Sequence, residues 1–391
     1  MKLLFFTLIL SACGGVPSSS SFKEAVGDLD TTFNETLGLG FVGSVDALKI
    51  QSDDRLLVAG RFTSFNGTDA QGVIRLESTG ALDASFQSSG QFNDSVFALA
   101  LQDDDKVLAG GVFTELAEIS NGGLVRLNAD GSVDGDFRVR LGTGFNGSVS
   151  TIAVQSDGKI LVGGEFTTVN GTTSRSLVRL LASGSIDTDF LSGTGSGFDL
   201  GVNRVLVQSD GKILVGGSFT TFKGVSNYRL LQLKSDGTLD NDFSAQIDQG
   251  FNGAVRSLLN EVGGFLLVGG DFTVVDGSEA EYFSVLKSSG ISSTTGLATL
   301  LPDYHVYDIA QQPNDSLLVS GQFAEVNGTT IGGLFRTSMA GELDTSFNTR
   351  LGSGFDGTVQ AIAPTAKGPI YAGGEFYTVD GTTVGRLAKI K

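Results

Sequence analysis

Tryptophan is absent from the 391-residue chain, and cysteine and histidine occur once each. A lone cysteine cannot form an intramolecular disulfide, and it excludes metal sites built from clustered cysteine and histidine. A Ser-His-Asp or Cys-His catalytic site would have to use His305, the one histidine. The chain also has no Gly-x-Ser-x-Gly sequence of the kind that positions a hydrolase nucleophile. We interpret His305 as a surface-loop residue and expect no catalytic residues and no resident cofactor.

Basic residues are scarce, since 26 lysines and arginines stand against 43 aspartates and glutamates, and the formal charge is −17. An acidic surface repels phosphate backbones, so nucleic acid is not an expected partner. Proline is low at five residues, whereas glycine (56) and phenylalanine (28) are abundant. A chain rich in aromatic residues is not typical of disorder, and its regularly placed glycines indicate many tight turns.

The first residues have the pattern of a secretory signal peptide. Lys2 precedes an apolar run that is too short to span a bilayer. The sequence Leu-Ser-Ala-Cys at 10–13 matches the bacterial lipobox, so Cys13 is the predicted lipidation site. We divide the chain into a signal peptide (1–12), a lipidated cysteine with a flexible tether (13–27) and a folded domain (28–391).

This anchor predicts a lipoprotein of the bacterial cell envelope that is attached to a membrane through Cys13. In two-membrane bacteria an aspartate after the lipidated cysteine tends to retain the protein at the inner membrane. Gly14 occupies that place, which favours the outer membrane, with the domain facing either the periplasm or the outside. We expect a monomer.

The motif Gly-x-Phe recurs seven times, at intervals of 51 or 53 residues. Its phenylalanines are Phe62, Phe113, Phe166, Phe219, Phe272, Phe323 and Phe376. A valine lies 17 residues before each of them, at Val45, Val96, Val149, Val202, Val255, Val306 and Val359. The positions 13 residues after them are Arg75, Arg126, Arg179, Gln232, Val285, Arg336 and Lys389. A period of this length is typical of solenoids and propellers.

The third repeat illustrates the local structure that we expect. Its apolar segments are 149–155, 160–167, 177–181 and 186–190, and Asp-Gly, Asn-Gly and Ser-Gly turns separate them. We predict four short antiparallel strands per repeat and an all-β fold, a seven-bladed β-propeller. A solenoid is the alternative, but it would require distinct capping repeats.

The termini favour closure of this propeller into a ring. Most repeats end in Leu-Asp-x-x-Phe, as at 239–243, but the last repeat stops at Lys391 without this element. The missing copy stands at 29–33, so we predict that the N-terminal strand completes the last blade. One repeat has Ser293 and Gly296 in place of the aspartate and phenylalanine, which predicts an irregular junction between the fifth and sixth blades.

The string QSDGKILVGGEF at 155–166 and the element Ile-Asp-x-x-Phe at 186–190 resemble the delta-60 repeat of bacterial secreted proteins, which are described as β-propeller domains of unknown function. The resemblance covers residues 29–391 and implies a propeller fold. It implies no activity and no binding residues. Kelch propellers also end a strand with Gly-Gly, but their blades carry a tryptophan, so kelch is similar in shape only.

Several repeated side chains are candidates for a site. Calcium needs only oxygen ligands, and the acidic groups are Asp103-Asp104-Asp105, Asp134/Asp136 and Asp240/Asp242. None has EF-hand spacing, and we interpret them as turn residues that accept backbone N–H bonds or pair with the Arg75-type positions. Arginine at one position of four repeats favours a structural role over an anion-binding ring. The Asn-Gly-Thr sequences at 66–68, 170–172 and 327–329 match a glycosylation sequon but are interpreted as hairpin turns.

These observations favour a non-enzymatic interaction module of the cell envelope that binds a protein or a glycan through one propeller face. One alternative is a glycan hydrolase or lyase that uses two carboxylates about 5–10 Å apart at the mouth of the central channel. Another is a structural component of the cell surface. A loop-rich face with apolar and aromatic patches would favour the binding module.

Overall fold

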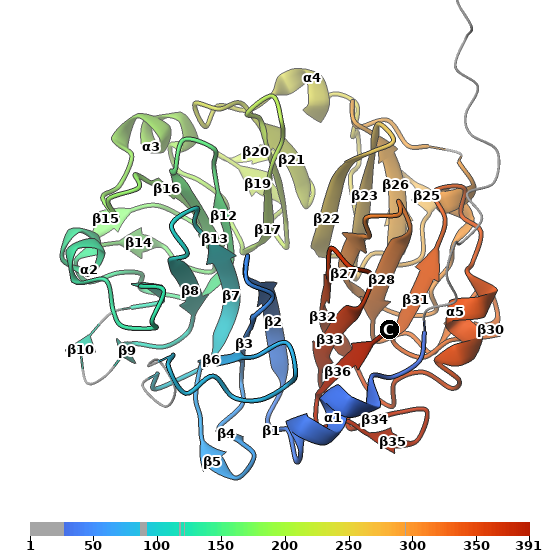
Figure 1. Ribbon diagram of the computed structural model, residues 1–391. Helices are drawn as coiled ribbons and strands as arrows, with labels where there is room; N and C mark the ends of the chain where they lie inside the picture. The colour runs from blue at the N-terminus through green and yellow to red at the C-terminus, as the bar shows by residue number, and fades with distance from the viewer. Residues whose placement is uncertain (1–26, 87–91, 117–118, 121, 294) are drawn as a thin grey trace, which may run out of the picture.

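The computed structural model describes residues 27–86, 92–116, 119–120, 122–293 and 295–391, so the predicted lipobox and Cys13 lie outside the described residues. Within this part of the chain, no helix is long and apolar enough to cross a membrane. Figure 1 shows the sheets standing around a central axis and following one another in chain order.

The described residues form seven three-stranded antiparallel sheets, one for each repeat, which we call sheets 1 to 7 in chain order. The inner strands, nearest the axis, are β2 (Val45–Ile50), β7 (Val96–Leu101), β12 (Val149–Val154), β17 (Val202–Val207), β22 (Val255–Val262), β27 (Val306–Gln311) and β32 (Val359–Pro364). The middle strands are β3 (Leu56–Gly60), β8 (Val107–Gly111), β13 (Ile160–Gly164), β18 (Ile213–Gly217), β23 (Phe265–Gly270), β28 (Leu317–Gly321) and β33 (Ile370–Gly374). The outer strands are β6 (Val73–Leu76), β11 (Leu124–Leu127), β16 (Leu177–Leu180), β21 (Leu230–Leu233), β26 (Phe283–Lys287), β31 (Leu334–Thr337) and β36 (Leu387–Ile390).

Neighbouring sheets pack face to face, and the core lies between them. All seven repeated valines and all seven repeated phenylalanines are buried, as predicted. A glycine in the middle strand lets the next sheet approach, because a Cβ on Gly163 would lie 2.6 Å from Val202 Cγ1. The same contact relates the last sheet to the first, where a Cβ on Gly373 would lie 2.4 Å from Val45 Cγ1. The inner strand β32 accordingly contacts β2.

Small hairpins follow the middle strands. They are β4 (Ser64–Phe65) with β5 (Thr68–Asp69), β9 (Glu115–Leu116) with β10 (Ile119–Ser120), β14 (Thr168–Val169) with β15 (Thr172–Thr173), β19 (Thr221–Phe222) with β20 (Val225–Ser226), β24 (Val274–Val275) with β25 (Ser278–Glu279), β29 (Glu325–Val326) with β30 (Thr329–Thr330), and β34 (Thr378–Val379) with β35 (Thr382–Thr383). The additional strand β1 (Phe41–Val42) pairs with β4. The predicted Asn-Gly turns connect three of these hairpins. Asn170 and Gly171, for example, have φ angles of 46° and 73°, as a two-residue turn requires.

The fourth strand of each repeat is where the structure differs from the prediction. The Leu-Asp-x-x-Phe element makes a single β-bridge to the outer strand, as Ile186 does with Leu180, and in five copies it then turns into a short α-helix. In these copies the aspartate caps the helix, as the Asp187 side chain does by accepting the backbone N–H of Phe190. The helices are α1 (Thr31–Leu37), α2 (Gly135–Leu141), α3 (Thr188–Thr194), α4 (Asn241–Ser244) and α5 (Thr345–Arg350).

The capping aspartates also pair with the buried arginines of the outer strands. Arg179 Nε lies 2.9 Å from Asp187 Oδ2, its Nη1 donates to the Ser235 carbonyl of the next sheet at 2.5 Å, and its guanidinium covers the Phe190 ring. The equivalent arginines of sheets 1, 2 and 6 bind their aspartates in the same way. This arrangement confirms the predicted pairing and assigns the arginines a structural role between sheets.

The chain termini repeat the same contacts between sheet 7 and the N-terminal segment. Leu29 forms a β-bridge with Ile390, and Asp30 N–H donates to the Lys389 carbonyl at 2.8 Å. The Lys389 ammonium lies 3.6 Å from Asp30 Oδ2 and 5.4 Å from the centre of the Phe33 ring. Residues 29–33 therefore occupy, beside sheet 7, the place that an internal Leu-Asp-x-x-Phe element occupies in its own sheet.

The predicted irregular junction lies between sheets 5 and 6. The 3-10 helix η1 (Gly296–Thr299) replaces the capped α-helix, and no side chain caps it. Leu297 is fully buried there and takes part in the hydrophobic cluster of sheets 5 and 6. The loss of aspartate and phenylalanine from this repeat thus removes the cap but keeps the core filled.

Acid should destabilise the fold through the capping aspartates. Burial alone would raise the pKa of Asp134, Asp187 and Asp240, but hydrogen bonds from backbone amides and nearby cations outweigh it and lower these pKa values. A carboxyl with a lowered folded-state pKa stabilises the protein above its unfolded pKa of about 3.9, and this contribution is lost as the pH falls through the folded value. We expect the temperature midpoint of thermal unfolding to decrease as the pH is lowered below about 4. Asp187→Asn keeps the cap and should make this decrease smaller. An identical pH profile for the variant, measured by calorimetry, would contradict this.

Candidate functional site

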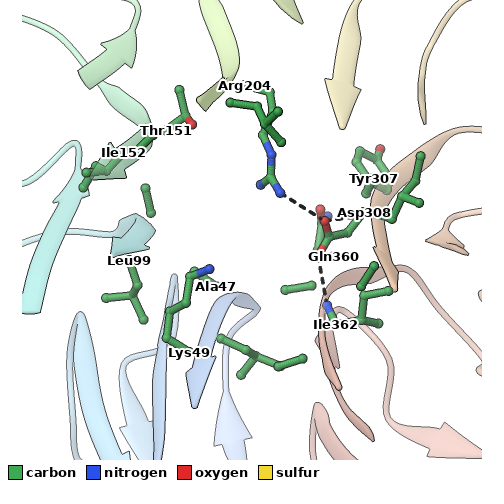
Figure 2. Close-up of a pocket in the computed structure, with 18 of the residues that line it drawn as sticks. Ala47, Lys49, Leu99, Thr151, Ile152, Arg204, Tyr307, Asp308, Gln360 and Ile362 are labelled. Carbon is green, nitrogen blue, oxygen red and sulfur yellow. Dashed lines mark hydrogen bonds and ion pairs between the residues drawn. The ribbon is translucent and has the colours of Figure 1, made fainter. Parts of the chain in front are cut away.

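The inner strands of all seven sheets enclose a central channel with a cavity of about 740 Å³ (Figure 2). Each sheet turns the edge of its inner strand toward the channel, so consecutive residues of these strands line it. The wall combines aliphatic side chains with a few charged ones, among them Lys49, Arg204 and Asp308.

Each inner strand begins with a β-bulge immediately after its valine. In sheet 1, Val45 pairs with Gly60 and Ala47 pairs with Ala59, so Asp46 is the extra residue, and the other six sheets have the same shift. A bulge redirects a side chain, and the seven extra residues line one end of the channel. We call this end the mouth and these residues the mouth ring, which consists of Asp46, Phe97, Ser150, Asn203, Arg256, Tyr307 and Gln360.

The mouth ring holds seven different amino acids, although the valine before each is invariant. The sequence prediction missed these residues, and this contrast is the signal that could have found them. The scaffold valine is the same in every repeat, whereas a position that contacts a partner is free to differ from sheet to sheet.

The mouth carries two ion-pair networks. In the first the mouth-ring residue is the carboxylate, and in the second the mouth-ring residue is the arginine. In sheet 1, Arg61 of the loop after β3 forms two hydrogen bonds with Asp46, at 2.9 and 3.0 Å, and lies 3.3 Å from Glu375 of sheet 7. In sheet 5 the arginine stands in the mouth ring, and Arg256 Nε lies 2.6 Å from Asp271 Oδ1. The carboxylates Asp46 and Asp271 are therefore both engaged by arginines.

Aromatic side chains gather beside the second network, at the junction of sheets 5 and 6. We call Tyr282, Tyr304, His305 and Tyr307 the aromatic cluster. The rings of Tyr304 and His305 stack at 4.0 Å with an interplanar angle of 9°, and the Tyr282 ring lies 5.3 Å from His305. Arg256 covers Tyr307 at 5.2 Å. An arginine and four aromatic side chains thus lie together on one side of the mouth.

One feature sets the aromatic cluster apart from the equivalent places in other sheets. The two positions before the repeated valine hold Tyr304 and His305 in sheet 6, whereas sheet 3 has the small pair Gly147-Ser148 there. Tyr282 has a φ of 61°, a left-handed conformation that costs a bulky residue about 1–3 kcal/mol. Sheets 1, 2 and 6 have glycine at this position, and sheets 3, 4 and 7 have Ser176, Arg229 and Arg386 in the same conformation. The fold therefore accommodates Tyr282 where glycine would be easier.

The aromatic cluster contains hydrogen-bond donors and lies beside a shared acceptor. Burial raises the pKa of Tyr282 and of Tyr307, so both phenols keep their protons at neutral pH and can donate. His305 Nδ1 lies 3.2 Å from Asp271 Oδ1, so this carboxylate is shared between His305 and Arg256.

His305 lies in the connection between sheets, as predicted, but it is not a freely exposed loop residue. Its side chain is 23% exposed and packs within the aromatic cluster. An Asp-His pair can activate a nucleophile, but among the described residues no hydroxyl or thiol forms a hydrogen bond with Nε2 of His305. The pair therefore lacks the third member of a catalytic triad in this part of the chain.

The acidic groups considered for calcium have structural surroundings. Asp104 pairs with Lys106 in the turn between β7 and β8, Asp134 pairs with Arg126, and Asp240 pairs with Lys212. Within the described ranges, no group of three or more His, Cys, Asp or Glu residues is arranged to hold a metal ion.

Exposed apolar side chains concentrate at the same end of the sheets as the mouth. We call this end the mouth face, and it carries the small hairpins and the segments that precede the inner strands. It contains nine of the thirteen large apolar residues that are most exposed in the described chain. They are Leu39, Val42, Val112, Leu200, Val225, Tyr228, Leu301, Tyr304 and Tyr377.

Comparison with known proteins agrees with this architecture. The segments 51–86, 102–137, 155–190, 208–243 and 312–347 each match a family profile described as "Domain of unknown function (DUF5122) beta-propeller". The chain is a β-propeller repeat protein. Each matched segment of the propeller runs from the turn after an inner strand to the phenylalanine of the Leu-Asp-x-x-Phe element. The repeat with Ser293 and Gly296, and the repeat divided between the termini, are not among the matched segments.

One solved structure supports the same fold. The propeller superposes on the WD40 β-propeller domain of Doa1 with a TM-score of 0.57 and 13% identity, covering 90% of this chain and 93% of that chain. It is also similar to YCF48 bound to D1 peptide, with a TM-score of 0.48, 9% identity and the same two coverages. No curated protein matches the sequence. At these low sequence identities the comparison concerns the fold alone.

Proposed function

We propose that this propeller is a non-enzymatic binding module of the bacterial cell envelope and that its mouth face recognises a protein partner. A lipid on Cys13 would hold it at the outer membrane, with residues 13–27 as a tether. The aromatic cluster beside Arg256 carries the proposal, because tyrosine and arginine are enriched among the residues that dominate protein interfaces.

A protein partner is favoured over a glycan by the aliphatic part of the mouth face. Leu39, Val42 and Leu200 are 81%, 62% and 52% exposed, and aliphatic side chains of this kind gain free energy when an apolar partner surface covers them. A glycan hydrolase would need two available carboxyl groups at the mouth, whereas Asp46 and Asp271 are already bound to arginines.

We further infer a ring of seven blades, each a three-stranded sheet with its Leu-Asp-x-x-Phe bridge, closed by residues 28–33. The bridge between Leu29 and Ile390 and the contact of Lys389 with Asp30 support this closure. Such closure protects both chain ends from acting as free sheet edges. We also infer that these repeats are delta-60 repeats, as the sequence resemblance implies.

Closure predicts that Leu29→Asp lowers the midpoint of thermal unfolding by several degrees, because a charge would enter the apolar cluster that Leu29 joins. Leu39→Asp is the matched control, since Leu39 is 81% exposed and the same substitution there should leave the midpoint within about a degree. Equal midpoints for the two variants, measured by differential scanning calorimetry, would contradict closure by this segment.

The partner can be sought by pull-down from envelope extract, with and without calcium. We expect the wild-type protein to enrich one protein and Tyr304→Ala to lose it, because the substitution removes the stacked ring that is 43% exposed. Val139→Ala on α2 is the control and should retain it, since Val139 is exposed outside the mouth face. Enrichment of a glycan would instead support the second partner class, and enrichment unaffected by Tyr304→Ala would contradict the assigned face.

A further inference from the structure

The interior of the channel, below the mouth ring, carries charged side chains on different walls. Figure 2 shows Lys49 of β2 and Arg204 of β17 reaching into the channel from opposite sides. Arg204 Nη2 lies 3.6 Å from Asp308 Oδ1. Asp308 also accepts the backbone N–H groups of Ile309 and Ile362, at 3.1 and 3.2 Å. Asp308 is therefore already satisfied by Arg204 and two amides.

Lys49 has no such partner. Its ammonium has no hydrogen-bond or ion-pair partner among the described residues, and its side chain is exposed to the space of the channel. The surrounding protein and the nearby Arg204 lower the pKa of Lys49, whereas Asp308 raises it. The three charged groups sum to one net positive charge inside an otherwise acidic protein, which favours an anionic ligand there.

Backbone donors lie on the same side of the channel as Lys49. The third residue after each valine does not hydrogen-bond within its sheet, because ladder bonds alternate along a strand. In sheets 4, 6 and 7 its N–H is accepted by a side chain of the preceding sheet, as Val205 N–H is by Thr151 Oγ1 at 3.2 Å. In sheets 1, 2 and 3 the corresponding side chain is an alanine, so the N–H groups of Leu48, Leu99 and Ile152 lack that acceptor.

The same alanines, Ala361, Ala47 and Ala98, leave apolar space in the wall next to these donors. One ammonium and three N–H groups around a small apolar recess suit a singly charged acid with a compact hydrocarbon part. We propose that the channel binds a small organic carboxylate at Lys49, and this site is separate from the protein-binding surface of the mouth face. The carboxylate can belong to a free acid or to the C-terminus of a peptide that enters through the mouth.

Isothermal titration of the full-length protein in nonionic detergent tests the site, with butyrate as the ligand and butyramide as its uncharged counterpart. We expect butyrate to bind, butyramide to bind at least about tenfold more weakly, and Lys49→Met to weaken butyrate to the same extent. Lys287→Met is the control, because Lys287 is exposed at the end of β26, outside the channel lining. Absence of butyrate binding to the wild-type protein, or equal binding by Lys49→Met, would overturn the proposal.

Two further measurements separate the alternatives. The ¹³Cε resonance of Lys49 should shift during the butyrate titration in wild-type protein, which tests the site even if Lys49→Met folds poorly, and an unchanged resonance would count against it. A tripeptide Gly-Ala-Ala with a free C-terminus, compared with its amide, then identifies the source. Competition with butyrate by the free peptide alone supports a peptide carboxylate, and binding of butyrate without such competition supports a free acid. Neither result depends on the partner of the mouth face.

Discussion

Phe166→Ala is expected to lower the free energy of unfolding by about 3–5 kcal/mol. Phe166 is 1% exposed, and its ring lies 4.7 Å from Phe145 in an edge-to-face arrangement with an interplanar angle of 73°. It belongs to the hydrophobic cluster between sheets 2 and 3, which also holds Val149 and Ile160. Truncation removes buried surface and leaves a cavity that the two sheets cannot close without moving relative to their neighbours. Urea titration and the midpoint of thermal unfolding measure the loss.

Phe97→Ala is the matched control for this prediction. Phe97 is the mouth-ring residue of sheet 2, is only partly buried and lies outside the cluster of its sheet. The same truncation there should cost less than about 1 kcal/mol. Comparable losses for the two variants would mean that the repeated phenylalanines do not form the core between sheets.

Arg336→Met should cost about 3–5 kcal/mol of stability, because it leaves a buried carboxylate without its cation. Arg336 and Asp344 are 2% and 1% exposed, and Arg336 Nε lies 2.8 Å from Asp344 Oδ2. The guanidinium also covers the Phe347 ring at 4.5 Å. Of the repeated arginines, Arg336 is the most deeply buried, so this substitution should have the largest effect in the series.

The double variant Arg336→Met/Asp344→Asn distinguishes a lost charge pair from lost packing. Asparagine can still accept the Phe347 N–H that Asp344 accepts at 3.1 Å, but it carries no charge. We expect the double variant to recover at least about 1 kcal/mol relative to Arg336→Met. A double variant that is less stable than the single one would show that the charge of Asp344 is not what the arginine compensates.

Spacing along the chain was sufficient to predict most of the scaffold. The valine, the Gly-x-Phe motif and the Asn-Gly turns recur at fixed distances because each repeat must present the same surfaces to its two neighbours. The apolar residues of the Leu-Asp-x-x-Phe element predict a strand. In five copies the structure shows one bridge and an α-helix instead, and Asp187 and its equivalents cap these helices with their carboxylates.

The candidate site was less accessible to sequence reasoning. Arg256, Asp271, Tyr282 and Tyr304 are separated by up to 48 residues and come together only when sheets 5 and 6 pack. The bulge that directs the mouth ring toward the channel leaves no residue signature of its own. The rarity of His305 and its loop position predict a surface residue, and neither property reveals that it stacks on Tyr304.

Photo-crosslinking in the intact envelope tests the binding face most directly. A photoreactive phenylalanine analogue would replace Phe97 in the mouth ring, Tyr377 on the mouth face or Val139 on α2, since all three side chains are accessible and none belongs to the core clusters. The account predicts that the first two positions crosslink to the same protein and that Val139 does not. Crosslinking from Val139 alone, or from none of the three, would contradict a protein-binding mouth face.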